Sequence, residues 1–350
     1  MREVAVVAFG QSDHVRDSAE TSEVEMLMPV LHDVLGQAGL KARDIGFTCS
    51  GSSDYLAGRA FSFTMALDGV GAWPPIAESH VETDGAWALY EAWVKILTGE
   101  ADTALVYAYG KSSPGDVREV LTRQLDPYYV APLWPDSVAL AALQAQALID
   151  AGHTDERELA RIAARSRTAA ADNPHAQLTG SVPAGDYLVA PLRAGDCPPV
   201  SDGAAAVVLA AGDTARRLTD RPAWIRGIDH RIEAHSLGVR DLAASPSTRL
   251  AAERAGYFEH PVDTAELHAP FTSQEVVLRR ALDLDGADTQ VVVNPSGGAL
   301  AANPVMAAGL IRIGEAADRI RRGASDRALA HATSGPCLQQ NLVAVLEGES

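Results

Sequence analysis

The chain has 350 residues, with 29 Lys and Arg against 46 Asp and Glu, and a formal net charge of −17 at neutral pH. Its length fits about two domains or one large duplicated α/β unit. The acidic excess argues against nucleic acid or an anionic membrane surface as a partner. Helix N-termini and single arginines still allow an anionic small ligand.

The three cysteines, Cys49, Cys197 and Cys337, have neither metal-ligand spacing nor a disulfide framework. We therefore expect no metal site, and reduced thiols in a cytoplasmic protein. The apolar part of the first residues, MREVAVVAFGQSDHVRD, is too short for a signal peptide. No apolar run approaches the roughly 20 residues of a membrane span. The sequence thus predicts a cytoplasmic globular protein.

Strands and helices alternate in the first part of the chain. The predicted elements are, in chain order, a strand at 3–10, a helix that starts at 25 and closes at Gly39, a strand within 44–53 that runs into a Gly/Ser turn, a helix at 84–98 and a strand at 103–110. The helix at 84–98 is apolar nearly all round, which predicts a buried central helix. Gly99 directly follows it, as expected at a helix C-terminus.

The sequence contains a weak internal repeat. GEADTALVYAYG, from Gly99, aligns with GASDRALAHATSG, from Gly323, with five identities at one constant offset. Each segment follows a long predicted helix, 84–98 in one case and 304–322 in the other. We therefore predict a duplicated α/β fold with halves at 1–215 and 216–350. The helix-rich section at about 111–199 is predicted to be a loop domain inserted in the first half.

Three segments resemble the thiolase superfamily. NPSGGALAANPVMAAG (294–309) resembles a signature in which Asn-x-x-Gly-Gly runs into a His-Pro pair and a helix. PPVSDGAAAVVLA resembles the Ser-Asp-Gly-Ala-Ala motif that closes the first thiolase half. ELHAPFTSQE (266–275) is similar to the His-containing loop of the sterol-carrier-protein-type, or lipid-transfer-protein-type, branch. ADNPHAQ and CLQQN add to the match, which follows the family's order over almost the whole chain.

The resemblance implies the thiolase fold, in which two βαβαβαββ halves form a five-layer αβαβα arrangement with an inserted helical loop domain. It also implies a coenzyme A thioester as substrate, with no permanently bound cofactor. A homodimer or a hetero-oligomer is the implied assembly.

Glu82 stands where the family has its nucleophilic cysteine, because ETDGAWAL fits the frame Cys-x-x-Gly-x-x-Ala-Leu. A carboxylate would form a mixed anhydride with an acyl group, so ordinary thiolysis through this position is not expected. Two interpretations stay open. Glu82 is a general base whose pKa is raised by desolvation, or Glu82 or Asp84 supports the first turn of the helix.

Asn303 and His268 are the next candidates. Asn303 replaces the family's His before Pro, and we favour a role as helix N-cap, since Pro304 suits a first helical position. Its alternative role is to donate a hydrogen bond to an oxyanion. His268 matches the His of the branch, which the resemblance implies orients water or donates to the acyl carbonyl. A structural histidine is the alternative.

Cys337 lies close to the family's second, acid/base cysteine, but LQQNLVAVLE replaces the glycine-rich run expected after it. A functional thiol and a buried small hydrophobic residue both stay open. The tight turns of NPSGG are expected to lie against the pantetheine arm or the thioester, and their alternative role is turn geometry alone. The residues concerned are Asn294, Ser296, Gly297 and Gly298.

The resemblance implies three possible functions. Some actinobacterial members of this branch lack the nucleophile and act as aldol lyases on steroid side-chain β-hydroxyacyl-CoAs. They do so with a small OB-fold acyl-CoA-binding partner or a thiolase-like sister subunit. A carbon–carbon lyase of this kind is the first hypothesis, a catalytically silent subunit the second, and a 3-ketoacyl-CoA thiolase or acyltransferase the third. Convergence of Glu82 and His268 on one open cavity would favour an enzyme, and a blocked cavity the silent subunit.

Overall fold

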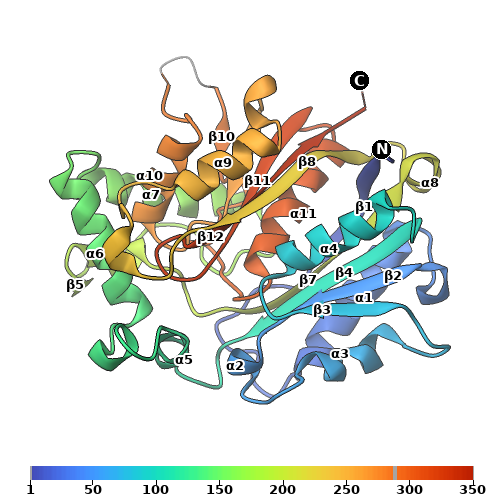
Figure 1. Cartoon of the computed structure of the whole chain (residues 1–350), viewed down its shortest axis with the longest axis horizontal. Helices are drawn as coiled ribbons and strands as arrows, with labels where there is room; N and C mark the ends of the chain where they lie inside the picture. The colour runs from blue at the N-terminus through green and yellow to red at the C-terminus, as the bar shows by residue number, and fades with distance from the viewer. Residues whose placement is uncertain (1, 287–289, 350) are drawn as a thin grey trace.

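The computed structural model describes residues 2–286 and 290–349. A ten-stranded mixed sheet runs through the molecule, and each half of the chain supplies five strands (Figure 1). Those of the first half are β1 (Val4–Gln11), β2 (Phe47–Gly51), β3 (Glu78–Val81), β4 (Thr103–Lys111) and β7 (Asp202–Ala211). Those of the second half are β8 (Ala223–Ile232), β9 (Thr264–Leu267), β10 (Val292–Val293), β11 (Arg327–Ser334) and β12 (Gln340–Glu347).

The strand order repeats between the two halves. From the centre outward, the first half has the order β1-β7-β4-β2-β3 and the second has β8-β12-β11-β9-β10. In both halves the outer three strands are parallel to one another and the pairs β4–β7 and β11–β12 are antiparallel. The repeat found in the sequence contains most of β4 and all of β11, which occupy equivalent positions in the two halves. The strand order therefore agrees with an internal duplication.

The helices complete five layers. Helices α1 (Glu23–Gln37) and α3 (Phe63–Val70) cover the outer face of the first half, and α9 (Pro246–Arg254) and α10 (Thr272–Ala281) cover that of the second. Between the two five-stranded parts lie α4 (Gly85–Leu97) and α11 (Ala308–Arg321), whose apolar residues form one buried cluster with both (Figure 1). This arrangement confirms the predicted fold class, and it brings the N-termini of α4 and α11 together.

The section between β4 and β7 is mostly helical. It contains α5 (Val117–Arg123), α6 (Ser137–Asp150), α7 (Glu156–Ala169) and the small sheet of β5 (Tyr187–Val189) and β6 (Leu192–Arg193). α6 and α7 pack on α10 of the second half, and the section projects to the left in Figure 1. The short helices α2 (Asp54–Ala57) and α8 (Gly212–Leu218) complete the chain. Across 2–286 and 290–349, no helix has both the length and the apolar character that a bilayer crossing requires.

The observed start of α4 agrees with the prediction, whereas that of α11 does not. Helix α4 begins after the N-cap Asp84, as expected, and Gly99 has a left-handed φ of 83° just beyond its C-terminus. Helix α11 begins only at Ala308, with Ala307 as its N-cap. The preferred role of Asn303 as N-cap is therefore wrong. A turn at 304–307 separates it from the helix.

Candidate functional site

A cavity of about 790 Å³ opens between the helical section and the segments that directly precede the two central helices. This volume falls within the range of roughly 300–1,000 Å³ that is common for small-molecule sites. The lining includes three of the predicted residues, His268, Asn303 and Cys337, and also Asp84. The other predicted residues are outside that lining: Glu82, Asn294, Ser296, Gly297 and Gly298.

His268 follows β9 and is fixed as a neutral imidazole. Its Nδ1 accepts a hydrogen bond from the backbone N–H of Thr333 at 3.3 Å, so its proton is on Nε2. Nε2 lies 3.2 Å from Oδ1 of Asn303 and donates to it. Burial, with a smaller contribution from His331 and Arg312, lowers the pKa of His268 to about 3. His268 is therefore a hydrogen-bond donor at neutral pH, with its basic nitrogen already occupied.

The contact with His268 also sets the orientation of Asn303. Because Oδ1 accepts from His268, the Nδ2 group is the donor that Asn303 can present to a ligand. Its backbone N–H donates to Ser201 Oγ at 2.9 Å, and the residue is 8% exposed. The side chain is thus held in one orientation at the cavity, which suits a donor to an oxyanion.

Asp84 is the buried carboxylate of the site. Its Oδ1 accepts from the N–H groups of Ala86 at 2.9 Å and Leu310 at 3.0 Å, and its Oδ2 accepts from Gly309 at 2.9 Å. It therefore caps α4 and α11 together. Burial raises its pKa to about 6, although these hydrogen bonds act in the opposite direction. The sequence analysis considered Asp84 only as a cap of its own helix, α4. Its position before Gly85 does not indicate that it also caps α11.

Glu82 lies apart from this cavity. Its Oε1 accepts from the backbone N–H of Asp54 at 2.6 Å, its Oε2 lies 3.5 Å from His80, and its side chain is 47% exposed. The desolvated carboxylate that we expected at Glu82 is thus found two residues later, at Asp84. Glu82 and His268 do not both line the cavity.

None of the three cysteine thiols is activated. Burial raises the pKa of Cys337 to about 11 and those of Cys197 and Cys49 to about 12. Cys337 Sγ lies 3.4 Å from the carbonyl oxygen of Leu140, and its side chain packs with Leu125 and Leu140. A thiolate nucleophile requires a lowered pKa instead. The chain therefore offers no cysteine suited to attack a thioester.

The side chains of the NPSGG turn form hydrogen bonds to other parts of the protein. Asn294 accepts from the N–H of Leu267 at 2.6 Å, and Ser296 Oγ donates to Glu266 at 2.7 Å, beside the buried Glu266–Arg312 ion pair. Gly297 has a φ of 95°, and a Cβ there would approach Ala170 Cβ to 2.6 Å. These contacts explain the turn by packing and internal hydrogen bonds.

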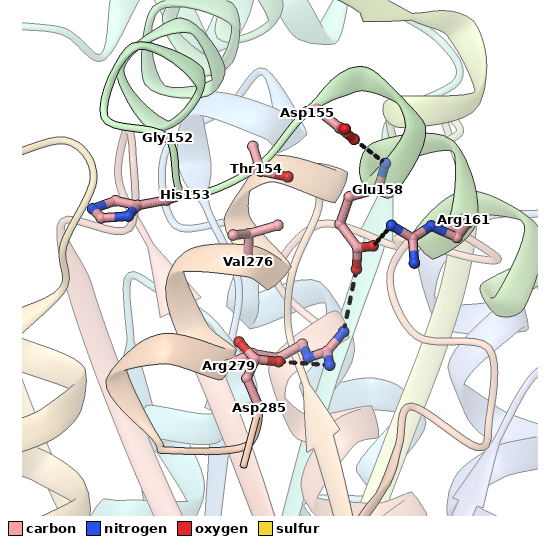
Figure 2. A pocket seen from close by; sticks show the side chains of 9 residues that line it. All are labelled: Gly152, His153, Thr154, Asp155, Glu158, Arg161, Val276, Arg279 and Asp285. Carbon is pink, nitrogen blue, oxygen red and sulfur yellow. Dashed lines mark hydrogen bonds and ion pairs between the residues drawn. The ribbon is translucent and has the colours of Figure 1, made fainter. Parts of the chain in front are cut away.

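A second, smaller pocket of about 450 Å³ lies between the start of α7 and α10 (Figure 2). Its charged groups pair with one another. Glu158 binds Arg161 at 2.6 Å and lies 3.7 Å from Arg279, which binds Asp285 at 2.6 Å. These charges are already compensated, and none of the predicted site residues lines this pocket.

No family model matches the chain. The sequence is 26% identical to an acetyl-CoA acetyltransferase of Methanothermobacter thermautotrophicus, over 96% of this chain and 95% of the relative. It is 27% identical to the 17-hydroxy-3-oxo-4-pregnene-20-carboxyl-CoA lyase of Mycobacterium tuberculosis, over 64% of this chain and 61% of that protein.

Two solved structures share the fold over nearly their whole length. The Ltp2-ChsH2(DUF35) aldolase superposes with a TM-score of 0.81 at 18% identity, covering 99% of this chain and 97% of that one. Human mitochondrial 3-ketoacyl-CoA thiolase superposes with a TM-score of 0.78 at 16% identity, covering 99% of both chains. The protein has the thiolase fold, and its sequence is similar to that of a thiolase-type acetyl-CoA acetyltransferase over almost the whole chain.

Proposed function

We propose that this protein is a carbon–carbon lyase that cleaves a β-hydroxyacyl-CoA by a retro-aldol reaction, without an acyl-enzyme. One observation carries the proposal. The cavity holds a hydrogen-bond donor, Asn303 Nδ2, whose orientation is set by the contact of Asn303 with His268, while the chain has no thiol with a lowered pKa. Such a site can stabilise a developing negative charge on oxygen, but it lacks the nucleophile for thiolysis.

The proposed reaction needs one base and one oxyanion site. A base takes the β-hydroxyl proton, the O–H electron pair forms the ketone or aldehyde, and the Cα–Cβ bond breaks. Its electron pair moves onto the thioester as an enolate, which is then protonated at Cα to give a shorter acyl-CoA. No oxidant, reductant or free coenzyme A is consumed.

Two groups of the cavity suit these roles. Asn303 Nδ2, oriented by His268, is assigned to the thioester oxygen as it gains charge. Asp84 is assigned as the base, because it lines the same cavity and its pKa of about 6 is close to the operating pH. A pKa in this range leaves the carboxylate ionised at pH 7 and still able to accept a proton.

The relatives support the substrate class. One relative is named as a lyase of a steroid carboxyl-CoA, and one structure with this fold is an aldolase complex of two proteins. We therefore propose an acyl-CoA substrate with a bulky, steroid-like side chain, and a thiolase-like or small OB-fold partner. The proposed setting is the cytoplasm, in keeping with three free cysteines.

The second candidate is a catalytically silent subunit. It is favoured by the exposed position of Glu82 outside the cavity, and by the backbone donors on both oxygens of Asp84. In this case Asp84 and His268 hold the structure together, and a thiolase-like partner carries the reaction. The open cavity of about 790 Å³ favours the lyase.

The test is to co-express the chain with its genomic neighbours and to assay the purified complex with a 3-hydroxyacyl-CoA carrying a steroid side chain. We expect a ketone and a shorter acyl-CoA in the absence of free coenzyme A. Asn303→Ala should lower kcat by roughly 100-fold or more, as for loss of one oxyanion donor. Glu82→Gln, outside the cavity, is the matched control and should stay within about twofold.

Two results would contradict the lyase. Full turnover in Asn303→Ala would assign the chemistry to the partner. Product that forms only when free coenzyme A is added would indicate thiolysis.

A further inference from the structure

The loop at 335–338, which joins β11 to β12, has an unusual backbone. Gly335 has a φ of 76°, Cys337 of 53° and Leu338 of 58°. Residues other than glycine rarely adopt this left-handed conformation, and each costs about 1 kcal/mol or more unless the surroundings hold it. Gly335, Pro336 and Cys337 line the large cavity. The cavity wall is therefore a strained loop that needs support.

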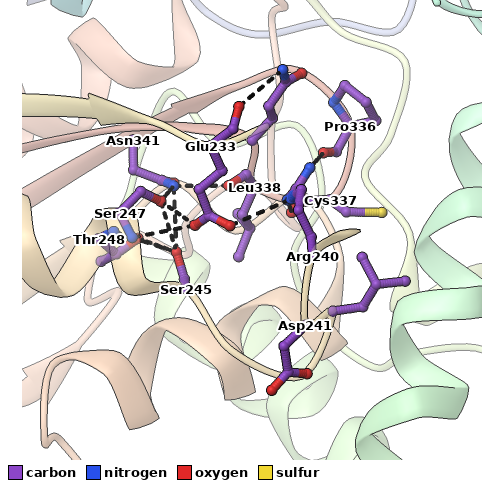
Figure 3. A network of polar contacts seen from close by, with 12 residues as sticks. Glu233, Arg240, Asp241, Ser245, Ser247, Thr248, Pro336, Cys337, Leu338 and Asn341 are labelled. Carbon is purple, nitrogen blue, oxygen red and sulfur yellow. Dashed lines mark hydrogen bonds and ion pairs between the residues drawn. The ribbon is translucent and has the colours of Figure 1, made fainter. Parts of the chain in front are cut away.

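The support consists of side chains that hold three successive carbonyl groups (Figure 3). Arg240 donates from Nη1 to the carbonyl oxygen of Pro336 at 3.1 Å, and from Nη2 to that of Cys337. Asn341 Nδ2 donates to the carbonyl oxygen of Leu338 at 2.8 Å. The planar guanidinium group suits this double contact, because its donors are fixed in a fork.

Arg240 is held in turn by Glu233. Its Nε lies 3.4 Å from Glu233 Oε2, and the two side chains are 5% and 11% exposed. Glu233 Oε1 accepts from the backbone N–H of Ser247 at 3.2 Å and from its hydroxyl group. Asn341 donates to Ser247 Oγ at 2.7 Å, which closes the network. The end of β8, the start of α9, β12 and the loop thus form one buried polar unit.

This unit also reaches His268. Thr333, two residues before Gly335, supplies the N–H that fixes the His268 tautomer. A change in the path of the loop would move Thr333 and release Nδ1 of His268. The loop therefore links the shape of the cavity wall with the orientation of His268 and, through it, of Asn303.

We infer that Arg240, anchored by Glu233, is a positioning residue of the site: it holds the 335–338 loop against the cavity and thereby keeps His268 oriented toward Asn303. The effect of Arg240 on catalysis rests on the proposed function, whereas its effect on the conformation of the 335–338 loop does not. A buried ion pair by itself is weak grounds for a stabilising role. The inference rests on the two donors that Arg240 directs at the strained loop.

The experiment measures the loop directly through the Cys337 thiol, which is 5% exposed. In a Cys49→Ala, Cys197→Ala background of the full chain, the rate of reaction of Cys337 with 5,5′-dithiobis(2-nitrobenzoic acid) is compared between variants. Arg240→Gln should react roughly tenfold faster or more, because two charge-assisted hydrogen bonds are lost. Arg240→Lys, which keeps the charge and loses the fork, should lie between, and it remains informative if Arg240→Gln fails to fold.

The matched control is Arg249→Gln, on α9 of the same region, whose ion pairs with Glu253 and Asp283 are at the surface. This variant should react like the parent protein. A second readout is the nitrogen NMR signals of His268, which should report the Nε2–H tautomer in the parent and a mixture in Arg240→Gln. A merely stabilising ion pair would not change the tautomer.

Unchanged Cys337 reactivity and an unchanged His268 tautomer in both Arg240 variants would overturn the inference. Failure of the lyase would look different. In that case the parent protein would show no cleavage of the 3-hydroxyacyl-CoA, while thiol reactivity and tautomer would still respond to Arg240. The two ideas can therefore fail separately.

Discussion

Helices α4 and α11 lie side by side in the middle layer, yet their N-termini are satisfied in different ways. Helix α4 has its own N-cap, Asp84, whose carboxylate accepts from Ala86 in the first turn. Helix α11 starts at Ala308 with no side-chain cap of its own. Two N–H groups of its first turn, those of Gly309 and Leu310, donate to the same Asp84. One carboxylate from the first half thus serves both helices.

This difference explains the role that is left to Asn303. Because Asp84 satisfies the start of α11, Asn303 is free to face the cavity and contact His268. The shared cap requires close approach of the two helices, and Gly309 permits it. A Cβ at this position would lie 2.5 Å from Asp84 Oδ1 and 2.6 Å from Ala332 Cβ. The start of α11 is thus capped by a carboxylate from the other half of the chain, and Asn303 takes no part in it.

The largest expected effect is that of Asp84→Ala. The variant leaves the N-termini of two buried helices without three hydrogen bonds, so the free energy of unfolding should fall by roughly 4 kcal/mol. Asp155→Ala is the control, since Asp155 is exposed and caps α7 alone through Glu158 N–H at 2.8 Å. It should cost about 1 kcal/mol. Urea unfolding measures both, and equal losses would refute the shared cap.

The next effect is the pH dependence of Asp84. Its folded-state pKa of about 6 is above its ordinary value of 3.8, so ionising it costs more in the folded than in the unfolded protein. Its contribution to stability is fully present below about pH 3.8 and is lost as the pH rises through about 6. Relative to Asp84→Asn, the wild-type protein should lose about 3 kcal/mol over this window.

The difference between the wild-type protein and Asp84→Asn removes the pH-dependent contributions of His14, His268 and His331, which are common to both proteins. Burial lowers the pKa of each of these histidines, so their own contributions change in the opposite direction with pH. Urea unfolding at several pH values between 4 and 7 provides the measurement. If the difference in the free energy of unfolding between the two proteins stays constant with pH, burial does not raise the pKa of Asp84.

The smallest effect on stability should be that of Asn303→Ala. Because Asn303 is not the cap of α11, we expect a loss of about 1 kcal/mol or less, from its single side-chain contact with His268. A loss of 2 kcal/mol or more by thermal or urea unfolding would restore a capping role. Together with the large expected loss of kcat, this result would separate a site residue from a structural one.

Much of the fold was predictable from local patterns. The apolar strands, the central helix at 84–98 and its end at Gly99 follow from periodicity and capping residues that act within one turn. His268 and Cys337 were selected by resemblance, and the structure places both at the cavity. Asn303 was placed at a helix start because Asn-Pro is locally a good cap. The pattern carries no information about a competing carboxylate more than 200 residues away.

The sequence by itself determined the alternation of strands and helices, because hydrophobic periodicity and capping depend on near neighbours along the chain. It also showed the internal repeat and the absence of a cysteine at the start of α4, because both are read directly from residue identities. Only the tertiary structure decided which carboxylate is desolvated, Asp84 and not Glu82, and how His268, Asn303 and the 335–338 loop are oriented. Burial and long-range hydrogen bonds set these properties, and both arise only when the two halves pack around α4 and α11.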